Sequence, residues 1–381
     1  MNTIWYILLV ILGISVLVIT HELGHYLMGK ALGFTIVEFS VGLGPKLFGI
    51  KGKETEFTLR ALPIGGSCRF YGEDQEVQDE RCFNSKPAWR RFLVVLAGPL
   101  TNILTCVVLA FVMLLGFGEV VDRSSDELLI VQEVVKGGPA EEAGVQVGDV
   151  IVAIDGKPLQ NSDAVSEAVS AADLHHLELT VLRGAQLQTN ETKDGRLTTT
   201  ETTVQGGTEL TLTLGDLLDQ ETGEKRIKVT YARPSVRETV ETYSVGKAAY
   251  MAFPYTWDLG KLVYQSIGMI VTGKASFRDM TGIVGTVDFV SDTMAQTKSA
   301  TAAVDLFLWF MALIAVNLGI VNLFPLPALD GGRLIFIIIE MIRRKPVPPE
   351  KEGVIHLVGM VLLLVLMVAL TVSDIMRCFG G

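Results

Sequence analysis

Charged residues are missing from four long stretches of the sequence. Residues 3–20, 92–118 and 306–329 contain none, and residues 354–372 form a fourth apolar run. Each run is about as long as the roughly 20 residues that a membrane-spanning helix needs. Hydrophobic residues make up 49% of the 381 residues, and four such runs argue against the buried core helices of a soluble protein. The sequence therefore predicts a multi-pass α-helical membrane protein with about four transmembrane helices.

The first run lacks the positively charged start and the small-residue cleavage site of a secretory signal peptide, so we expect it to be a membrane helix. Lys and Arg gather between the first two runs and again in "RRK" at 343–345. Cytoplasmic loops carry an excess of these residues. We therefore expect these loops in the cytoplasm of an inner (plasma) membrane protein, with both termini and the segment from about residue 119 to 302 outside.

Cysteines are few, and the chain has no net positive charge. The four cysteines are Cys68, Cys82, Cys106 and Cys378, and none forms a CxxC pair. No disulfide framework is implied. The formal net charge is −10, which gives no indication of a nucleic-acid-binding surface, so we expect no nucleic-acid partner.

Against this apolar background, two histidines and a glutamate stand at the end of the first run, in "HELGH". His21 and His25 are four residues apart, so both project from one face of a helix and can bind one zinc ion. Glu22 can act as general base on a water molecule that the zinc activates. Ionisable residues are costly in a membrane, which makes a chance occurrence of this HExxH pattern less plausible.

A catalytic zinc usually has a third protein ligand. Asp330 is the best candidate, because it follows a helix broken by prolines in "NLFPLPALDGG", and broken backbone in a membrane can line a cavity. One alternative is that Asp330 only caps the helix after it. Glu340 and His356 are rival ligands near the predicted cytoplasmic edge, without broken backbone around them.

These two motifs together resemble the site-2 proteases, which are intramembrane zinc metalloproteases. "FSVGLGPKLF", "ALPIGGSCRFYGED" and "LAGPLTN" also agree with the bacterial branch that carries an outer PDZ domain, the type that regulates sigma-E. The likeness covers nearly the whole chain. The family's GPVG stretch appears here as "GIVG", residues 282–285, which leaves its local role open.

The resemblance implies that His21, His25 and Asp330 bind one Zn²⁺ and that Glu22 is the catalytic base. Asn322 matches a family asparagine thought to hold the substrate backbone or the oxyanion. The expected substrates are single-pass membrane proteins, such as anti-sigma factors or remnant signal peptides, usually cut first by an extracytoplasmic protease.

Two further segments are expected to contact substrate. Pro325 lies in the broken stretch before Asp330. The alternating segment 56–66 ends at Gly65 and Gly66 and resembles the family's membrane-dipping β-hairpin, which could pair with an unwound substrate strand. An ordinary cytoplasmic hairpin is the alternative.

The outer segment alternates Val-rich and Ile-rich runs with turns and one short helix, which resembles a single PDZ-like α+β domain over residues 119–233. Its polar insertion at 185–207 is expected to form a long hairpin, or else to be disordered. Residues 234–302 form a separate segment. Within it, aromatic residues beside Lys at 243–272 favour an interfacial helix over a fifth span. The protease core then comprises residues 1–118 and 303–381.

Two other classes of function fit less well. A transporter could relay protons through membrane histidines, but it predicts an internal repeat that this sequence lacks. A scaffold built on an inactive protease would not need all four proposed active-site residues. The sequence does not identify the substrate, the cleavage position or the oligomeric state. It also leaves open whether the PDZ-like domain excludes substrates by size or binds a C-terminus.

Overall fold

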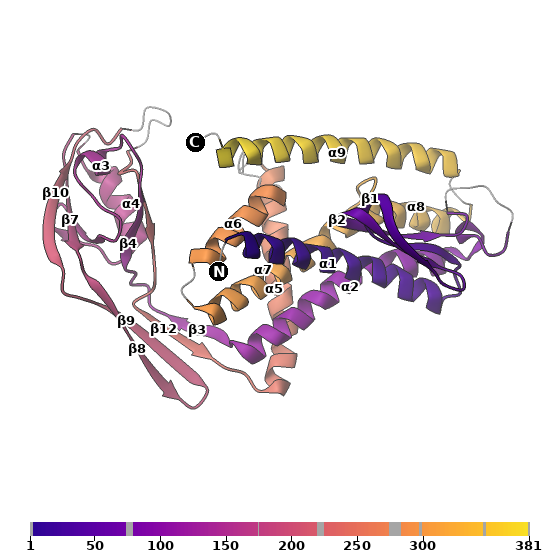
Figure 1. The fold of residues 1–381 in the computed structure, drawn as a ribbon, viewed down its shortest axis with the longest axis horizontal. Helices are drawn as coiled ribbons and strands as arrows, with labels where there is room; N and C mark the ends of the chain where they lie inside the picture. Colours follow the sequence, from indigo (N-terminus) through magenta and orange to yellow (C-terminus); the bar gives the residue numbers. More distant parts are fainter. Residues whose placement is uncertain are drawn as a thin grey trace. The chain divides into compact units, whose positions relative to one another are not determined.

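A computed structural model describes residues 3–73, 79–173, 175–218, 225–273, 283–296, 299–345 and 348–379. The chain forms two compact units (Figure 1): Met1–Phe117 with Ser244–Gly381, and Gly118–Tyr243. Gly282, the first residue of "GIVG", lies outside the described residues.

The first unit is mainly helical in its described part. Four of its helices, α1, α2, α7 and α9, are long and apolar enough to cross a membrane, as expected for a membrane protein. The helices are α1 (Thr3–Ala31), α2 (Ala88–Gly116), α5 (Val245–Val271), α6 (Ile283–Gln296), α7 (Ala300–Leu323), α8 (Asp330–Arg343) and α9 (Pro349–Phe379).

Glycines let three of these helices approach closely. A Cβ on Gly24 of α1 would lie 2.6 Å from the carbonyl oxygen of Ala97 in α2. A Cβ on Gly319 of α7 would lie 3.0 Å from the carbonyl oxygen of Pro99, also in α2. Helix α2 therefore packs backbone to backbone with both neighbours, as small residues allow in membrane proteins.

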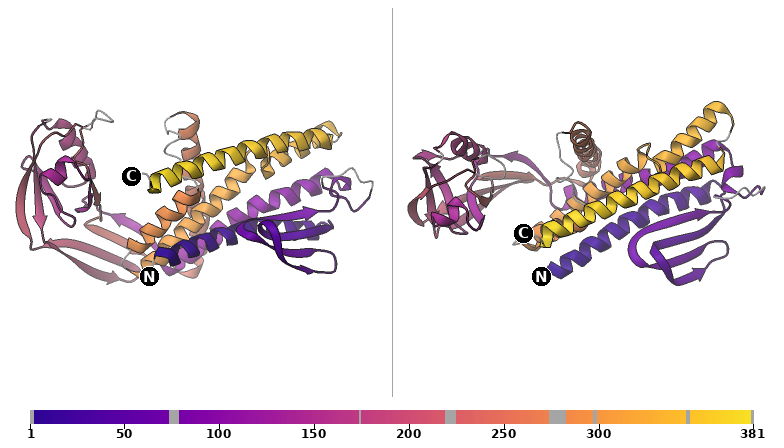
Figure 2. Two further views of the ribbon diagram at one scale, coloured as in Figure 1. Left: turned by 45° about the horizontal axis from the view of Figure 1, so that its top comes forward. Right: turned by 90° about the horizontal axis from the view of Figure 1, so that it is seen from above.

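Helix α5 runs across the direction of α1, α2 and α7 (Figure 1), and the two views of Figure 2 agree. Its aromatic residues Tyr250, Phe253 and Trp257 are exposed. Asp258 and Lys261 form an ion pair of 2.6 Å on its surface. These features are compatible with a helix lying in the membrane interface, which stays a prediction.

A two-stranded antiparallel hairpin packs beside α1, formed by β1 (Ile36–Lys51) and β2 (Glu56–Phe70). Its base is fixed by the buried rings of Phe34, Phe70 and Phe83, whose centroids lie 5.1 to 5.7 Å apart. Phe83 belongs to the short 3-10 helix η1 (Phe83–Ser85). This aromatic cluster attaches the hairpin to the end of α1.

The hairpin also contains a charge cluster around the buried Glu38. Glu38 receives hydrogen bonds from Thr58 at 2.8 Å and Arg60 at 2.7 Å, and it pairs with Arg69 at 2.8 Å. Burial by itself would raise the pKa of Glu38, but these hydrogen bonds and positive charges outweigh it and hold the pKa below its usual value.

The described residues of the second unit form two sheets and two short helices. One sheet has the strand order β10-β7-β5-β4-β11, with β6 paired to β5, and the other has the order β3-β12-β9-β8. The elements are β3 (Glu119–Arg123), β4 (Leu129–Val134), α3 (Pro139–Glu142), β5 (Val150–Ile154), β6 (Lys157–Pro158), α4 (Ser162–Ala171), β7 (Leu177–Arg183), β8 (Gln186–Asp194), β9 (Leu197–Gln205), β10 (Thr208–Leu214), β11 (Val229–Ala232) and β12 (Arg237–Glu241).

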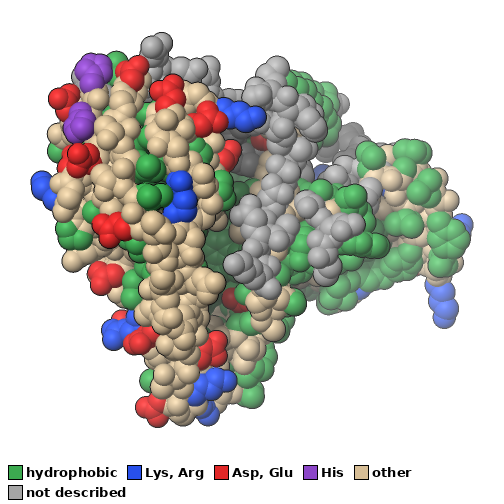
Figure 3. All heavy atoms as spheres, turned by 60° about the vertical axis from the view of Figure 1, so that its left-hand side comes forward, with side chains coloured by type: hydrophobic (Ala, Val, Ile, Leu, Met, Phe, Trp, Pro, Cys, Tyr) green, Lys and Arg blue, Asp and Glu red, His purple; other side chains and the backbone are tan. Residues whose placement is uncertain are grey.

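The core of the second unit is aliphatic, with Leu129, Val131, Leu177 and Leu179 almost fully buried. Its surface is mixed: on the face seen in Figure 3, acidic and basic side chains are interspersed. The polar segment expected as an insertion forms the hairpin of β8 and β9. The compact unit extends past the expected boundary at residue 233 to Tyr243, because β12 pairs with both β3 and β9.

Candidate metal centre and active site

The HELGH residues lie in the C-terminal half of α1. His21 and His25 project from the same face, and their Nε2 atoms lie 3.2 Å apart. The side chains are only 12% and 10% exposed. The helix therefore directs two nitrogen ligands at one point inside the apolar unit.

Asp330 reaches this point from the first turn of α8. The chain leaves helical backbone at Phe324, and Ala328 has a φ of +74°. This break places Asp330 Oδ2 at 3.1 Å from His21 Nε2 and 3.3 Å from His25 Nε2. The tight return depends on Gly331, because a Cβ there would lie 2.0 Å from the carbonyl oxygen of Phe324.

The three ligand atoms fit a zinc ion. Their separations of 3.1, 3.2 and 3.3 Å match the edge of a tetrahedron, about 3.3 Å, for ligands roughly 2.0 Å from a metal. Among the described residues, Asp330 Oδ2 is buried and has no hydrogen-bond partner of good geometry. Two imidazoles and one carboxylate are a ligand set of catalytic zinc, with one position left for water or substrate.

The rival ligands are engaged elsewhere. Glu340 forms an ion pair with Arg91 of α2. His356 of α9 accepts a hydrogen bond through Nδ1 from the backbone amide of Ala328, at 2.9 Å. In the described part of the chain, the group able to hold a metal ion consists of His21, His25 and Asp330.

Glu22 is half-buried beside the hairpin. A Cβ on Gly66 of β2 would lie 3.0 Å from Cγ of Glu22, so the strand passes directly against this side chain. Gly65 precedes it with a φ of +90°, in the left-handed region that favours glycine. The structure thus brings the expected substrate-binding glycines next to the expected base.

Asn322 and Pro325 lie near the break in the chain. Asn322 is half-buried in the last turn of α7, and Pro325 is exposed just after it. Their expected contact with substrate stays a prediction.

Three residues of α2 touch the histidines and were missed by sequence reasoning. His25 Nδ1 lies 2.9 Å from the carbonyl oxygen of Val94, and His21 Nδ1 lies 3.2 Å from Nδ2 of Asn102. Gly98 lies between them, where a Cβ would be 2.2 Å from His25 Nε2. The signal was present in "LAGPLTN", where Gly98 and Asn102 repeat the four-residue spacing of the histidines.

Comparison with known proteins decides the family. Residues 9–366 match the model of peptidase family M50. The chain belongs to peptidase family M50. A Clostridium perfringens protein, named provisionally as a zinc metalloprotease, is 33% identical over 97% of this chain and 98% of its own length. The regulator of sigma-W protease RasP of Bacillus subtilis is 29% identical over 95% and 96% of the two chains. The zinc metalloprotease RasP of Shouchella clausii is 30% identical over 96% and 97%.

The site-2 protease resemblance is therefore confirmed at the level of the family. This M50 member is a zinc metalloprotease with zinc as its cofactor. It is a membrane protein, and its described residues include four helices apolar and long enough to cross a membrane. The PDZ-like character of the second unit and the link to sigma-E stay predictions.

Proposed function

We propose that this M50 protease cuts peptide bonds within the transmembrane segments of single-pass membrane proteins. His21, His25 and Asp330 hold the zinc ion, and Glu22 is the base. The observation that supports this most strongly is the place of the ligand cluster. Its two histidines lie on an apolar helix long enough to cross a membrane and contact a second such helix, α2.

A zinc ion at this site supplies Lewis-acid chemistry, which acidifies water and polarises the carbonyl of the scissile peptide. Glu22 takes a proton from the attacking water as the oxygen of that water forms a bond to the carbonyl carbon. The carbon–nitrogen bond then breaks, and Glu22 returns the proton to the leaving amine. Gly66 leaves the space that the Glu22 side chain needs beside the strand.

Strand β2 offers a template for the substrate. Residues 56–59 of β2 pair with β1 on both sides, whereas residues 66–69 pair with β1 on one side only. In the described part of the chain, the half of β2 that begins at Gly66 therefore has an edge that no strand covers. A peptide in a membrane helix must unwind before its carbonyl can be attacked. We propose that the unwound segment adds to this edge near Gly65 and Gly66, beside Glu22.

The test of the proposed function is Glu22→Gln in purified full-length protein, with a single-pass model substrate in detergent. Cleavage should fall by about 10²- to 10⁴-fold, because the base is lost, while bound zinc is retained. Glu54→Gln is the matched control, since Glu54 is an exposed hairpin-turn residue paired with Lys30. A Glu22→Gln enzyme that cuts at the native rate contradicts the proposal.

The physiological substrates proposed are anti-sigma factors or remnant signal peptides, first shortened by another protease. One relative is named a regulator of sigma-W, which supports the anti-sigma class. The second unit, which we propose is PDZ-like and extracytoplasmic, would act on the outer part of the substrate. Size exclusion of untrimmed substrates is the first hypothesis for its role.

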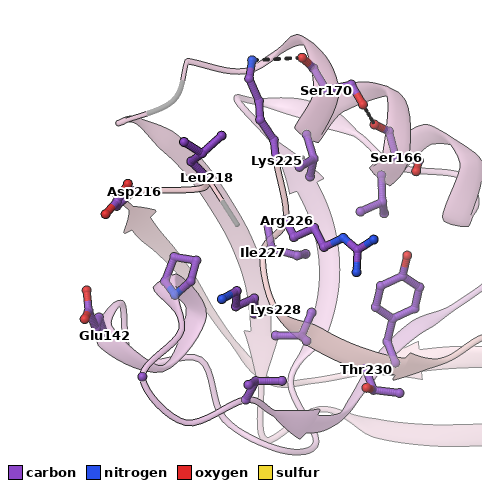
Figure 4. Close-up of a pocket in the computed structure, with 18 residues that line it drawn as sticks. Glu142, Ser166, Ser170, Asp216, Leu218, Lys225, Arg226, Ile227, Lys228 and Thr230 are labelled. Atoms are coloured by element: carbon purple, nitrogen blue, oxygen red, sulfur yellow. Dashed lines mark hydrogen bonds between the residues drawn. The ribbon is translucent and has the colours of Figure 1, made fainter. Parts of the chain in front are cut away.

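A specific observation favours capture of a peptide as the second hypothesis. A hollow of about 1170 Å³ lies between α4 and β11 in this unit. Strand β11 ends its sheet in the described residues, so an extended peptide could add to it. Figure 4 shows the basic side chains of Arg226 and Lys228 directed toward the hollow, where they suit a carboxylate.

Replacing residues 119–242 with a short linker separates the two hypotheses. Size exclusion predicts that cleavage of a full-length, untrimmed substrate appears. Capture predicts that cleavage of the trimmed substrate declines. If untrimmed substrate stays uncut and the trimmed form is cut more slowly, size exclusion is wrong.

The proposed topology places both termini outside the cytoplasm, with four spans. It rests on the distribution of Lys and Arg. A reporter fused after Gly381 should read as extracytoplasmic. A cytoplasmic reading means an odd number of spans or an inverted chain, and refutes the proposal.

A further inference from the structure

One face of α2 contacts the Nδ1 atoms of both histidines, on the side of each ring away from the metal position. Val94, Gly98 and Asn102 are four residues apart and therefore share a face of the helix. The carbonyl oxygen of Val94 meets His25 Nδ1 at 2.9 Å, and the amide of Asn102 meets His21 Nδ1 at 3.2 Å. In both rings, Nδ1 is bound from behind while Nε2 faces Asp330.

The contact with Val94 fixes the tautomer of His25. A carbonyl oxygen can only accept a hydrogen bond, so His25 Nδ1 carries the proton and donates it. The lone pair of His25 then stays on Nε2, which is the atom that faces the metal position. Metal-binding histidines are commonly oriented in this way.

His21 differs, because an amide side chain can donate or accept. If Asn102 donates through Nδ2, His21 must carry its proton on Nε2 and directs an N–H at the metal position. If Asn102 accepts through Oδ1, His21 carries its proton on Nδ1 and Nε2 is free to bind metal. Asn102 is fully buried, and its Oδ1 has no hydrogen-bond partner among the described residues. Turning the amide over gives Oδ1 the N–H of His21 and satisfies it.

We propose that Asn102 is a positioning residue for the metal centre. Its Oδ1 accepts the Nδ1–H of His21 and so selects the tautomer that binds zinc. The Val94 carbonyl has the same effect on His25, because it accepts the Nδ1–H and leaves the lone pair on Nε2. The inference rests on the proposed role of His21 as a zinc ligand.

The test compares zinc affinity in the purified full-length protein, measured by competition with a chelator. Asn102→Leu keeps the approximate volume but removes the acceptor, and it should weaken zinc binding by about 10- to 100-fold. Asn102→Asp keeps an acceptor oxygen and should hold native affinity. Cys106→Ala is the matched control, because Cys106 is also fully buried one turn further along α2; it should leave the affinity unchanged.

Three results would overturn the inference: Asn102→Leu binding zinc as tightly as the native chain, Asn102→Asp losing as much affinity as Asn102→Leu, or Cys106→Ala losing as much as Asn102→Leu. If Asn102→Leu fails to fold without zinc, Asn102→Ala takes its place, because it removes the amide without adding bulk. Its zinc affinity is then compared with that of the native chain and of Asn102→Asp. Native affinity in His21→Ala would instead contradict the proposed ligand set. That outcome is therefore distinct from a failure at Asn102.

Discussion

The two units of this protease use their interiors in opposite ways. In the membrane unit, ionisable side chains meet inside a set of apolar helices, and bare glycine backbone makes room for them. In the second unit the main core cluster is aliphatic, and its buried Asp149 is paired with the partly exposed Arg183 at the edge of the unit. The hollow lies at the edge of a sheet. A small change in side-chain volume beside the histidines should therefore abolish zinc binding and cleavage. The same kind of change in the core of the second unit should only reduce the stability of that unit.

The largest effect is expected from Gly98→Ala. The added methyl group would lie 2.2 Å from His25 Nε2 and 2.9 Å from His21 Cε1, so at least one ring must move. We expect zinc binding and cleavage to be lost, measured as zinc content and as turnover of the model substrate. Gly116→Ala is the control on the same helix, because no described atom outside its own turn of helix lies within 4 Å of the added carbon. A Gly98→Ala enzyme with normal zinc content would show that the metal centre tolerates added volume, contrary to this account.

A cavity in the second unit should have a smaller and different effect. Leu177 is fully buried in β7, and Leu177→Ala should cost about 2 to 5 kcal/mol in the free energy of unfolding of that unit. Zinc content should not change. Thermal unfolding of the full chain measures the loss of stability. Leu187→Ala, at an exposed position in β8, is the control. Loss of zinc in Leu177→Ala would show that the interiors are coupled.

The smallest effect concerns pH and the hairpin beside Glu22. The folded pKa of Glu38 is lower than its unfolded value, so its contribution to stability is complete above the unfolded pKa of about 4.3. That contribution is lost as the pH falls through the folded pKa. The protection of the hairpin amides, measured as hydrogen exchange relative to the intrinsic rate at each pH, should therefore decrease below about pH 4. Glu38→Gln should flatten this dependence, and an unchanged profile in that variant would assign the effect to another group.

Much of the membrane unit could be predicted from the sequence, because its signals are local. Charge-free runs mark the apolar helices, and the spacing of His21 and His25 places both rings on one face. Asp330 could be predicted because the prolines before it and the glycines after it mark broken backbone. The contacts of Val94, Gly98 and Asn102 could not be predicted, since they depend on which turn of α2 packs against α1.

The second unit shows a different limit. The hairpin of β8 and β9 follows from the alternating Thr-rich segment, but its pairing with β12 joins residues far apart in sequence. That pairing moves the boundary of the compact unit to Tyr243, whose hydroxyl donates a hydrogen bond to Glu119 at 2.6 Å. Local patterns give the strands, whereas their order in the sheet depends on tertiary packing.

The ligand set of the zinc ion is the central claim, and zinc content tests it most directly. Native protein should hold about one zinc per chain, while Asp330→Ala and the double variant His21→Ala, His25→Ala should hold far less. The rival positions supply the controls, so Glu340→Gln and His356→Gln should keep the native amount. Stoichiometric zinc in Asp330→Ala, or its loss in Glu340→Gln alone, would contradict the account.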